Sequence, residues 1–97
     1  MNNGTKVTSN ELKKRVKKAT CKLLGMIEKS DFAFVRYEKV PESVLNEMRI
    51  EISTVRITID ELNKIRDIIS QCGLRITSIV IYFGARSIVV GITVTLE

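Results

Sequence analysis

The 97-residue sequence contains no histidine, no tryptophan and only one proline. The missing histidine removes the commonest general base and the commonest metal ligand. The chain also has no glycine-rich phosphate loop, no G-x-S-x-G sequence and no motif-spaced pair of carboxylates. We therefore expect no catalytic residues, no metal site, no cofactor, no small-molecule substrate and no enzyme. A metal- or tyrosine-dependent activity is the enzymatic alternative that these absences leave open.

Long apolar runs and cysteine pairs are missing as well. No run approaches the ~20 residues of a membrane-spanning helix, and the first ten residues lack the apolar core of a signal peptide. Cys21 and Cys72 are too few and too far apart for a disulfide framework. These features predict a cytoplasmic, reducing location and no membrane association.

The two cysteines have different predicted surroundings. Cys72 shares a helical face with Ile65, Ile68 and Ile69, so we expect it to be buried. Cys21 falls among lysines, which favour the thiolate and could make it reactive. An incidental exposed cysteine is the interpretation we favour for Cys21.

The closing segment, residues 76–96, has the clearest period in the chain. From residue 88 onward every second residue is a large aliphatic one, namely Ile88, Val90, Ile92, Val94 and Leu96. This alternation predicts a strand with one face in the core. Residues 76–83 are nearly all apolar or β-branched, which is typical of a central strand covered on both faces. Gly84-Ala85 supplies the reversal between the two strands.

The first half of the chain opens with a predicted flexible arm, residues 1–7. Thr8 and Glu11 form a T-x-x-E capping box, so a helix should begin at Thr8 and end near Lys29. Its apolar stripe consists of Leu12, Val16, Ala19, Leu23 and Ile27. Residues 31–40 then favour a strand that Pro41 interrupts.

The middle of the chain predicts another strand and a second helix. Met48, Ile50 and Ile52 alternate with polar residues, but the apolar parity slips after Ser53-Thr54, which suggests a β-bulge there. Thr58 and Glu61 form a second capping box, so a helix should run from about Ile59 to Cys72. Gly73 stands where a left-handed residue would end it.

These elements predict one α+β domain over residues 8–97, with the order α-β-β-α-β-β. The expected architecture is a two-layer sandwich in which two helices cover one face of a mainly antiparallel four-stranded sheet. The strand order cannot be read from the sequence. The second sheet face should mix threonines such as Thr93 with apolar residues such as Val89, and a second copy often covers such a face. We therefore expect a homodimer.

Positive charge is concentrated at one end of the chain. Up to Lys29 there are eight basic and two acidic residues, a net charge of +6, whereas the remainder has eight basic and nine acidic residues. The first helix places like charges one turn apart, at a cost of about 0.2–0.5 kcal/mol per pair. A helix that keeps such repulsion is typical of one that binds a polyanion.

The main functional prediction is therefore a small basic protein that binds DNA or RNA through phosphate contacts. The predicted contact residues are Lys13, Lys14, Arg15, Lys17, Lys18 and Lys22, with Arg15 as the bidentate one. Lysines suit backbone phosphate better than base edges, so sequence specificity should be weak. Phe32, Phe34 and Tyr37 could stack on bases, but strand aromatics of a small domain are more often core.

Three alternatives remain for the lysines. They could solvate the helix, or bind an anionic membrane surface or an acidic protein. In the solvating case, the protein would be an interaction or adaptor module that works through the open sheet face or an edge strand.

Overall fold

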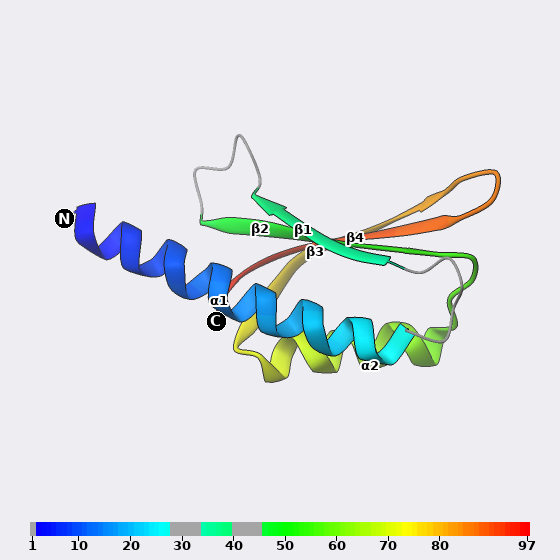
Figure 1. Ribbon diagram of the computed structural model, residues 1–97, viewed down its shortest axis with the longest axis horizontal. Helices are drawn as coiled ribbons and strands as arrows, with labels where there is room; N and C mark the ends of the chain where they lie inside the picture. Colours follow the sequence, from blue (N-terminus) through cyan, green and yellow to red (C-terminus); the bar gives the residue numbers. More distant parts are fainter. Residues whose placement is uncertain (1, 28–33, 40–45) are drawn as a thin grey trace.

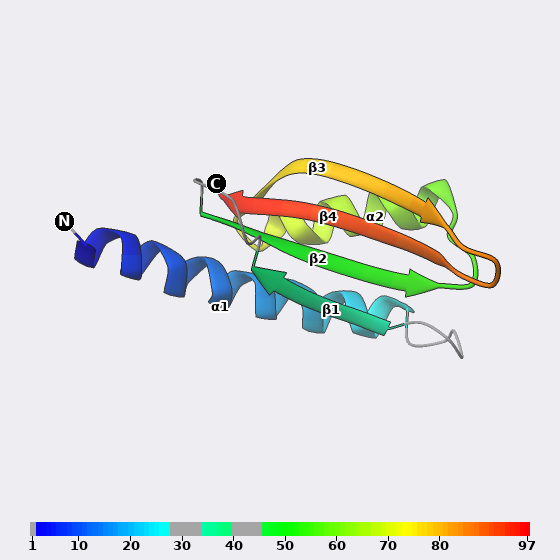
Figure 2. The ribbon, with the colours of Figure 1, turned by 90° about the horizontal axis from the view of Figure 1, so that it is seen from above.

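The computed structural model describes residues 2–27, 34–39 and 46–97 of the chain. They form two helices and four strands in the order α1 (Asn2–Ile27), β1 (Phe34–Lys39), β2 (Glu47–Thr54), α2 (Ile59–Gln71), β3 (Leu74–Phe83) and β4 (Ile88–Leu96). The strands make one sheet in the order β1-β2-β4-β3, and every neighbouring pair is antiparallel. Both helices cover the same face of this sheet (Figures 1 and 2). The predicted α+β two-layer architecture is confirmed.

The core lies between the sheet and the two helices. Val90, Ile92 and Val94 on β4 are at most 1% exposed, and the alternation predicted for this strand is confirmed. Helix α1 contributes four buried apolar residues, Leu12, Val16, Ala19 and Leu23, and α2 contributes Ile65 and Ile69. Each large aliphatic side chain buried here stabilises the fold by about 1.5–3 kcal/mol. This packing holds α1 firmly by one face.

The predicted start of the first helix at Thr8 was wrong. Helix α1 begins at Asn2, and its first turns extend beyond the end of the sheet (Figure 1). Residues 2–7 contain no proline, and only Gly4 among them strongly disfavours a helix, so nothing stops the backbone ladder from continuing toward the N-terminus. A T-x-x-E sequence caps a helix only where the backbone before it is non-helical. The predicted flexibility of residues 1–7 stays a prediction.

Helix α2 agrees closely with the sequence. Thr58 has an extended backbone and accepts a hydrogen bond from the Glu61 amide at 3.1 Å, while the Glu61 carboxylate accepts one from the Thr58 amide at 3.0 Å. The helix ends at Gln71, Cys72 caps it, and Gly73 follows with a φ of +76°. The capping box and the glycine stop are both confirmed.

Strand β3 was predicted to be central, and this was wrong. It is an edge strand whose single sheet partner is β4, and most of its residues from Thr77 to Phe83 are exposed. The apolar content was interpreted as burial on two faces, but α2 covers only part of its inner face. Large apolar side chains therefore remain at this edge.

The predicted bulge at Ser53-Thr54 was also wrong. Strand β2 pairs without a register shift up to Thr54 and ends there. Of the residues that carry the shifted parity, Val55 and Ile59 are 47% and 76% exposed, and Ile57 is partly buried against the core outside any strand. The change of parity marks the end of the strand. A register shift occurs instead in β3, between Ile76 and Ser78.

The predicted strand over residues 31–40 contains β1, Phe34–Lys39. Tyr37 on this strand is partly buried against the core, as expected for a strand aromatic. Residues 31–33 and 40, the predicted bend at Pro41, the aromatic Phe32 and the predicted helix end near Lys29 lie outside the described residues.

Candidate nucleic-acid interface

Helix α1 faces the core with one side and solvent with the other. The side chains of Lys13, Lys14, Lys17, Lys18 and Lys22 are all exposed. At about 100° per residue they form two rows, Lys14-Lys18-Lys22 and Lys13-Lys17, which together cover about half of the helix circumference. The sequence prediction that these lysines point away from the apolar stripe is confirmed.

No intramolecular carboxylate neutralises these five lysines within the described part of the chain. The ion pairs there join Arg15 to Glu11, Arg36 to Glu51 and Arg66 to Asp67, and none includes a lysine of α1. No hydrogen bond from these lysine side chains to a described residue is present either. No group within the described residues therefore competes with a partner for these ammonium groups.

Arg15 differs from its lysine neighbours because two of its N–H groups are already used. Its Nε donates to Glu11 Oε1 at 3.0 Å, and its Nη1 donates to the carbonyl oxygen of Gly73 at 2.9 Å. Gly73 lies in the turn between α2 and β3, so Arg15 joins α1 to that turn. The bidentate phosphate contact predicted for Arg15 would compete with both bonds.

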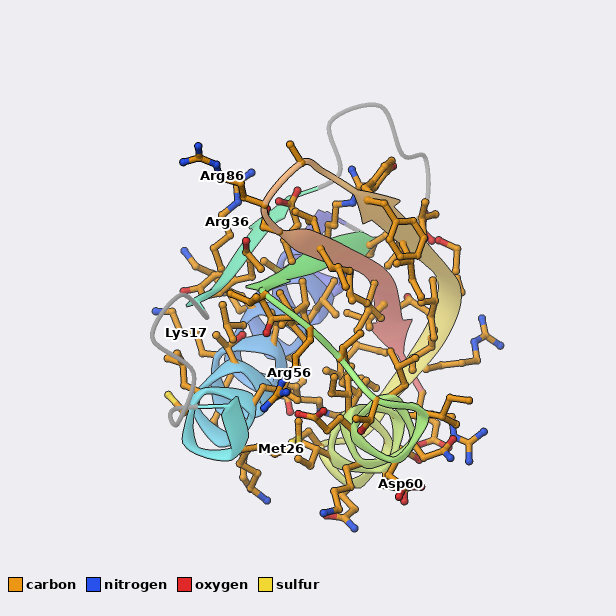
Figure 3. All side chains as sticks on the ribbon, turned by 90° about the vertical axis from the view of Figure 1, so that its right-hand side faces the viewer. Lys17, Met26, Arg36, Arg56, Asp60 and Arg86 are labelled. Atoms are coloured by element: carbon orange, nitrogen blue, oxygen red, sulfur yellow. The ribbon has the colours of Figure 1, made fainter. Side chains whose placement is uncertain are left out.

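Two arginines lie on the same flank of the molecule as Lys17. Viewed along the long axis of the molecule, Lys17 lies on the same flank as Arg36 and Arg86 (Figure 3). The Arg36 charge is offset by Glu51 at 2.8 Å, whereas Arg86 is exposed in the β3–β4 connection. The first turn of α1 contains no acidic residue. Glu11 is the one acidic residue of α1, and its carboxylate pairs with Arg15, so no acidic residue lies on the helix between Lys13 and Lys22.

Both cysteines are free, and their positions agree with the sequence. Cys72 is 6% exposed and belongs to the core, while Cys21 is exposed on α1. The reactivity of Cys21 stays a prediction.

The open face of the sheet carries a polar network that the sequence analysis missed. The guanidinium of Arg49 on β2 crosses β4 and donates from Nη2 to Tyr82 Oη on β3 at 3.3 Å. It lies over Gly91, where a Cβ atom would come within 3.2 Å of Arg49 Nε. The Thr77 hydroxyl lies 2.9 Å from Glu47 Oε2. A glycine inside an apolar strand was the available signal, because such a glycine often marks a close approach.

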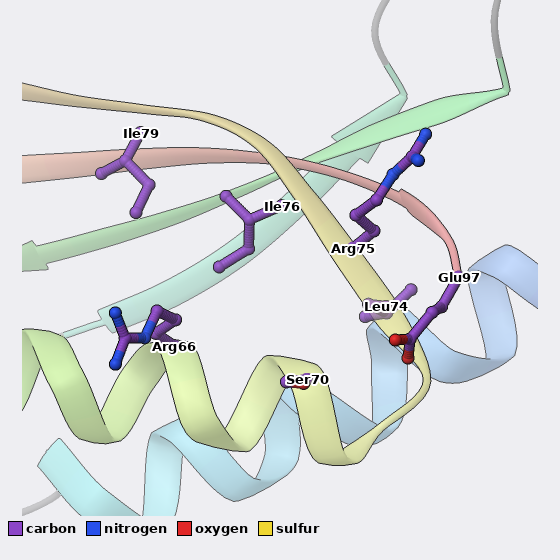
Figure 4. A pocket seen from close by; sticks show the side chains of 7 residues that line it. All are labelled: Arg66, Ser70, Leu74, Arg75, Ile76, Ile79 and Glu97. Atoms are coloured by element: carbon purple, nitrogen blue, oxygen red, sulfur yellow. The ribbon is translucent and has the colours of Figure 1, made fainter.

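A shallow groove runs between α2 and the inner side of β3. Ile76 and Ile79 point into it from β3, and Arg66 and Ser70 line it from α2 (Figure 4). Its lining is mainly apolar. It therefore continues the apolar edge of β3 toward the helix layer.

Neither a metal-ligand cluster nor a membrane-spanning helix accompanies the lysine rows in the described residues. Within residues 2–27, 34–39 and 46–97, no group of three or more His, Cys, Asp or Glu residues could hold a metal ion. None of the helices in these ranges is long and apolar enough to cross a bilayer. The chain matches no protein-family model, and a search of curated proteins found no relative.

Proposed function

We propose that this protein binds nucleic acid through phosphate contacts made by Lys13, Lys14, Lys17, Lys18 and Lys22. One observation carries the proposal: all five ammonium groups are exposed and unpaired among the described residues, on a helix whose other face is buried in the core. The backbone of such a helix is already ordered before binding, so only the lysine side chains lose freedom on contact with phosphate.

The spacing of the lysines suits a phosphate backbone. The row Lys14-Lys18-Lys22 spans about 12 Å of the helix axis, because each residue rises about 1.5 Å. Duplex DNA carries one charge per about 1.7 Å of its axis, so this row faces several phosphates. With Lys17 from the second row, four contacts at one time are reasonable.

Sequence specificity should be weak. Lysine is a point charge, whereas base edges are best read by the planar fork of arginine, and the arginine on this helix already binds Glu11 and Gly73. We therefore propose that Arg15 holds α1 in position and that the lysines make the phosphate contacts. DNA and RNA both fit this chemistry.

Fluorescence anisotropy with labelled duplex and single-stranded oligonucleotides tests the proposal. Four phosphate contacts give a slope of about −3.6 for log K against log salt, which is a loss of roughly 100-fold between about 50 and 200 mM salt. Absence of binding at micromolar protein in the lower salt would reject nucleic-acid binding and leave the lysines a solvating role. Vesicles with anionic lipid, tested in parallel, would reveal the membrane alternative.

A charge-matched pair of variants locates the contacts. Exchanging Lys14, Lys18 and Lys22 for glutamine should weaken binding to all sequences alike and flatten the salt slope by about 2.7. The control exchanges Arg56, Lys64 and Arg75 for glutamine, since these cations are exposed and lie outside α1. Equal losses in the two triple variants would mean that net charge, and not this helix, drives binding.

The alternative function, protein binding by a sheet edge, is favoured by a separate observation. Strand β3 exposes Ile79, Val80, Tyr82 and Phe83, which bind no polyanion. The two functions use opposite sides of the domain, since α1 packs mainly on β1 and β2. We place either function in the cytoplasm, which two free cysteines support.

A further inference from the structure

Four of the seven large hydrophobic residues that are exposed among the described residues lie on the edge strand β3. Ile79, Val80, Tyr82 and Phe83 are 46%, 39%, 51% and 80% exposed. Along this ten-residue strand, every second residue directs its backbone N–H and C=O groups away from β4, so these groups have no strand to pair with. Such an edge is a template for another strand.

The usual protections of an edge strand are absent from its second half. The nine residues 77–85 include no charged residue and no proline. The bulge lies between Ile76 and Ser78, so residues 78–83 pair regularly with β4. Lysines, prolines and bulges are the features by which monomers avoid edge-to-edge pairing. This stretch is thus suited to pairing.

We propose that β3 pairs antiparallel with β3 of a second copy of this chain, across a two-fold axis at Val80. In that register Val80 faces the partner's Val80, Ile79 faces the partner's Ile81, and Ser78 faces the partner's Tyr82. Ile79 and Ile81 lie on the inner face and Ser78, Val80 and Tyr82 on the outer face, as their partners on β4 show. Each facing pair therefore shares one face, as antiparallel pairing requires.

The chemistry of the edge favours a second copy over a charged partner. A two-fold axis brings each central residue against itself, so a charge near the axis would face a like charge. Residues 78–82 have none, and Arg75 and Arg86 lie outside the five paired residues. The charged groups that reach this stretch come from β2, and Arg49 and Glu47 already bond Tyr82 and Thr77 within the chain. An uncharged apolar stretch can pair with an identical strand without placing like charges opposite each other.

The groove beside β3 gives the inner face of this interface room to pack. Ile79 points from β3 toward α2 and borders the groove with Arg66 and Ser70 (Figure 4). The partner's Ile81 would stand next to Ile79 at this position. Side-chain burial here adds to the backbone pairing, as in other strand-addition complexes.

The dimer would be one continuous eight-stranded sheet. The two-fold axis stands perpendicular to the sheet, so both helix layers lie on the same face. The two α1 helices then lie at the outer ends of this face, because α1 packs on β1 and β2. Their lysines stay uncovered, so dimer formation does not depend on nucleic-acid binding.

Sedimentation equilibrium of the full chain tests the proposal. We expect a dimer at about 50 μM that persists at high salt, since the interface is apolar. Val80→Lys should raise the dissociation constant by at least about tenfold, because two lysines then meet at the axis. Val55→Lys is the matched control: it makes the same change at a 47% exposed valine away from β3 and should leave the dimer intact.

A mixing experiment tests the register itself. Val80→Lys and Val80→Glu chains should each be monomeric, whereas an equimolar mixture should form a heterodimer, because opposite charges meet at the axis. A monomeric wild type, or a Val80→Lys dimer as tight as the wild type, would overturn the proposal. If these variants fail to fold, amide hydrogen exchange of the wild type tests the interface. The amides of residues 78–82 should become more protected as the protein concentration rises, and unchanged protection would refute the β3 interface.

Discussion

The Nη1 group of Arg15 donates a hydrogen bond to the carbonyl oxygen of Gly73, 58 positions further along the chain. This bond connects the basic helix α1 to the turn between α2 and β3. Gly73 has a φ of +76°, which L side chains rarely adopt, and a Cβ atom there would lie 2.8 Å from Arg15 Nη1. The position thus requires glycine for two reasons, its backbone conformation and the approach of Arg15.

Gly73→Ala should therefore destabilise the fold. The left-handed conformation costs alanine about 1–2 kcal/mol, and displacement of the Arg15 guanidinium adds to this. Gly25→Ala is the control, because Gly25 lies in α1 with no atom within 4 Å of its Cβ position, and it should stabilise by about 0.5–1 kcal/mol. Urea unfolding followed by circular dichroism measures both. A Gly73→Ala protein as stable as the wild type would contradict the turn geometry.

Arg15→Gln should lower stability more than it lowers nucleic-acid binding. The variant loses a half-exposed ion pair, worth about 0.2–1 kcal/mol, and the bond to Gly73. The Gly73 carbonyl also accepts a hydrogen bond from the Glu97 amide at 3.2 Å, so it keeps a partner in the variant. We therefore expect the free energy of unfolding to fall by about 1 kcal/mol in total. Lys18→Gln, in contrast, should raise stability by about 0.4–1 kcal/mol, because it removes two like-charge pairs, and should reduce the salt slope by about 0.9. If Arg15→Gln instead weakened nucleic-acid binding and left stability unchanged, Arg15 would be a phosphate contact.

The two T-x-x-E sequences should respond differently to the same substitution. Thr58→Ala removes the side chain that accepts from the Glu61 amide, which should cost about 0.5–2 kcal/mol. Thr8→Ala should cost no capping energy, because α1 begins at Asn2 and Thr8 is inside the helix. Unfolding free energies of the two variants decide. A cost at Thr8 as large as that at Thr58 would mean that the helix begins at Thr8 after all.

Local patterns predicted those parts of the fold that depend on neighbouring residues. The alternation of Val90, Ile92 and Val94 and the cap at Thr58 are short-range signals, and the structure confirms both. The lysine rows of α1 follow from helical spacing in the same way. The five lysines are therefore exposed as predicted, because exposure of a helix face is set by the apolar stripe opposite it, whereas Arg15 of the same predicted site is partly buried.

Features that depend on distant partners could not be predicted in this way. The edge position of β3 follows from the pairing of β2 with β4, and the composition of β3 alone resembles that of a buried strand. The role of Arg15 depends on a carbonyl far along the chain. The outer-face contact of Arg49 with Tyr82 crosses a third strand. No periodicity within one segment carries this information.

Lys18→Glu should stabilise the protein while it weakens nucleic-acid binding. Lys18 has Lys14 and Lys22 one turn away on either side, so the substitution turns two repulsive pairs into attractive ones and should gain about 0.8–2 kcal/mol. Lys64→Glu on α2 should instead destabilise the protein, since its neighbours Asp60 and Asp67 are acidic, and it leaves the lysines of α1 in place. Thermal unfolding at low salt and anisotropy measure the two effects. If Lys18→Glu is no more stable than the wild type, the repulsion that motivates the proposed function does not exist.

The β3 dimer and the basic helices should cooperate on a long duplex. Two α1 helices on one face of the dimer can contact a duplex of about 40 base pairs together, whereas a duplex of about 10 base pairs engages one of them. Val80→Lys should then weaken binding to the long duplex by at least about tenfold and affect the short one little. The added positive charge alone would strengthen binding, and Val55→Lys, which adds the same charge, controls for it. Both duplexes are titrated with both variants. If the monomeric Val80→Lys protein binds the long duplex as tightly as the Val55→Lys protein does, the two helices act independently.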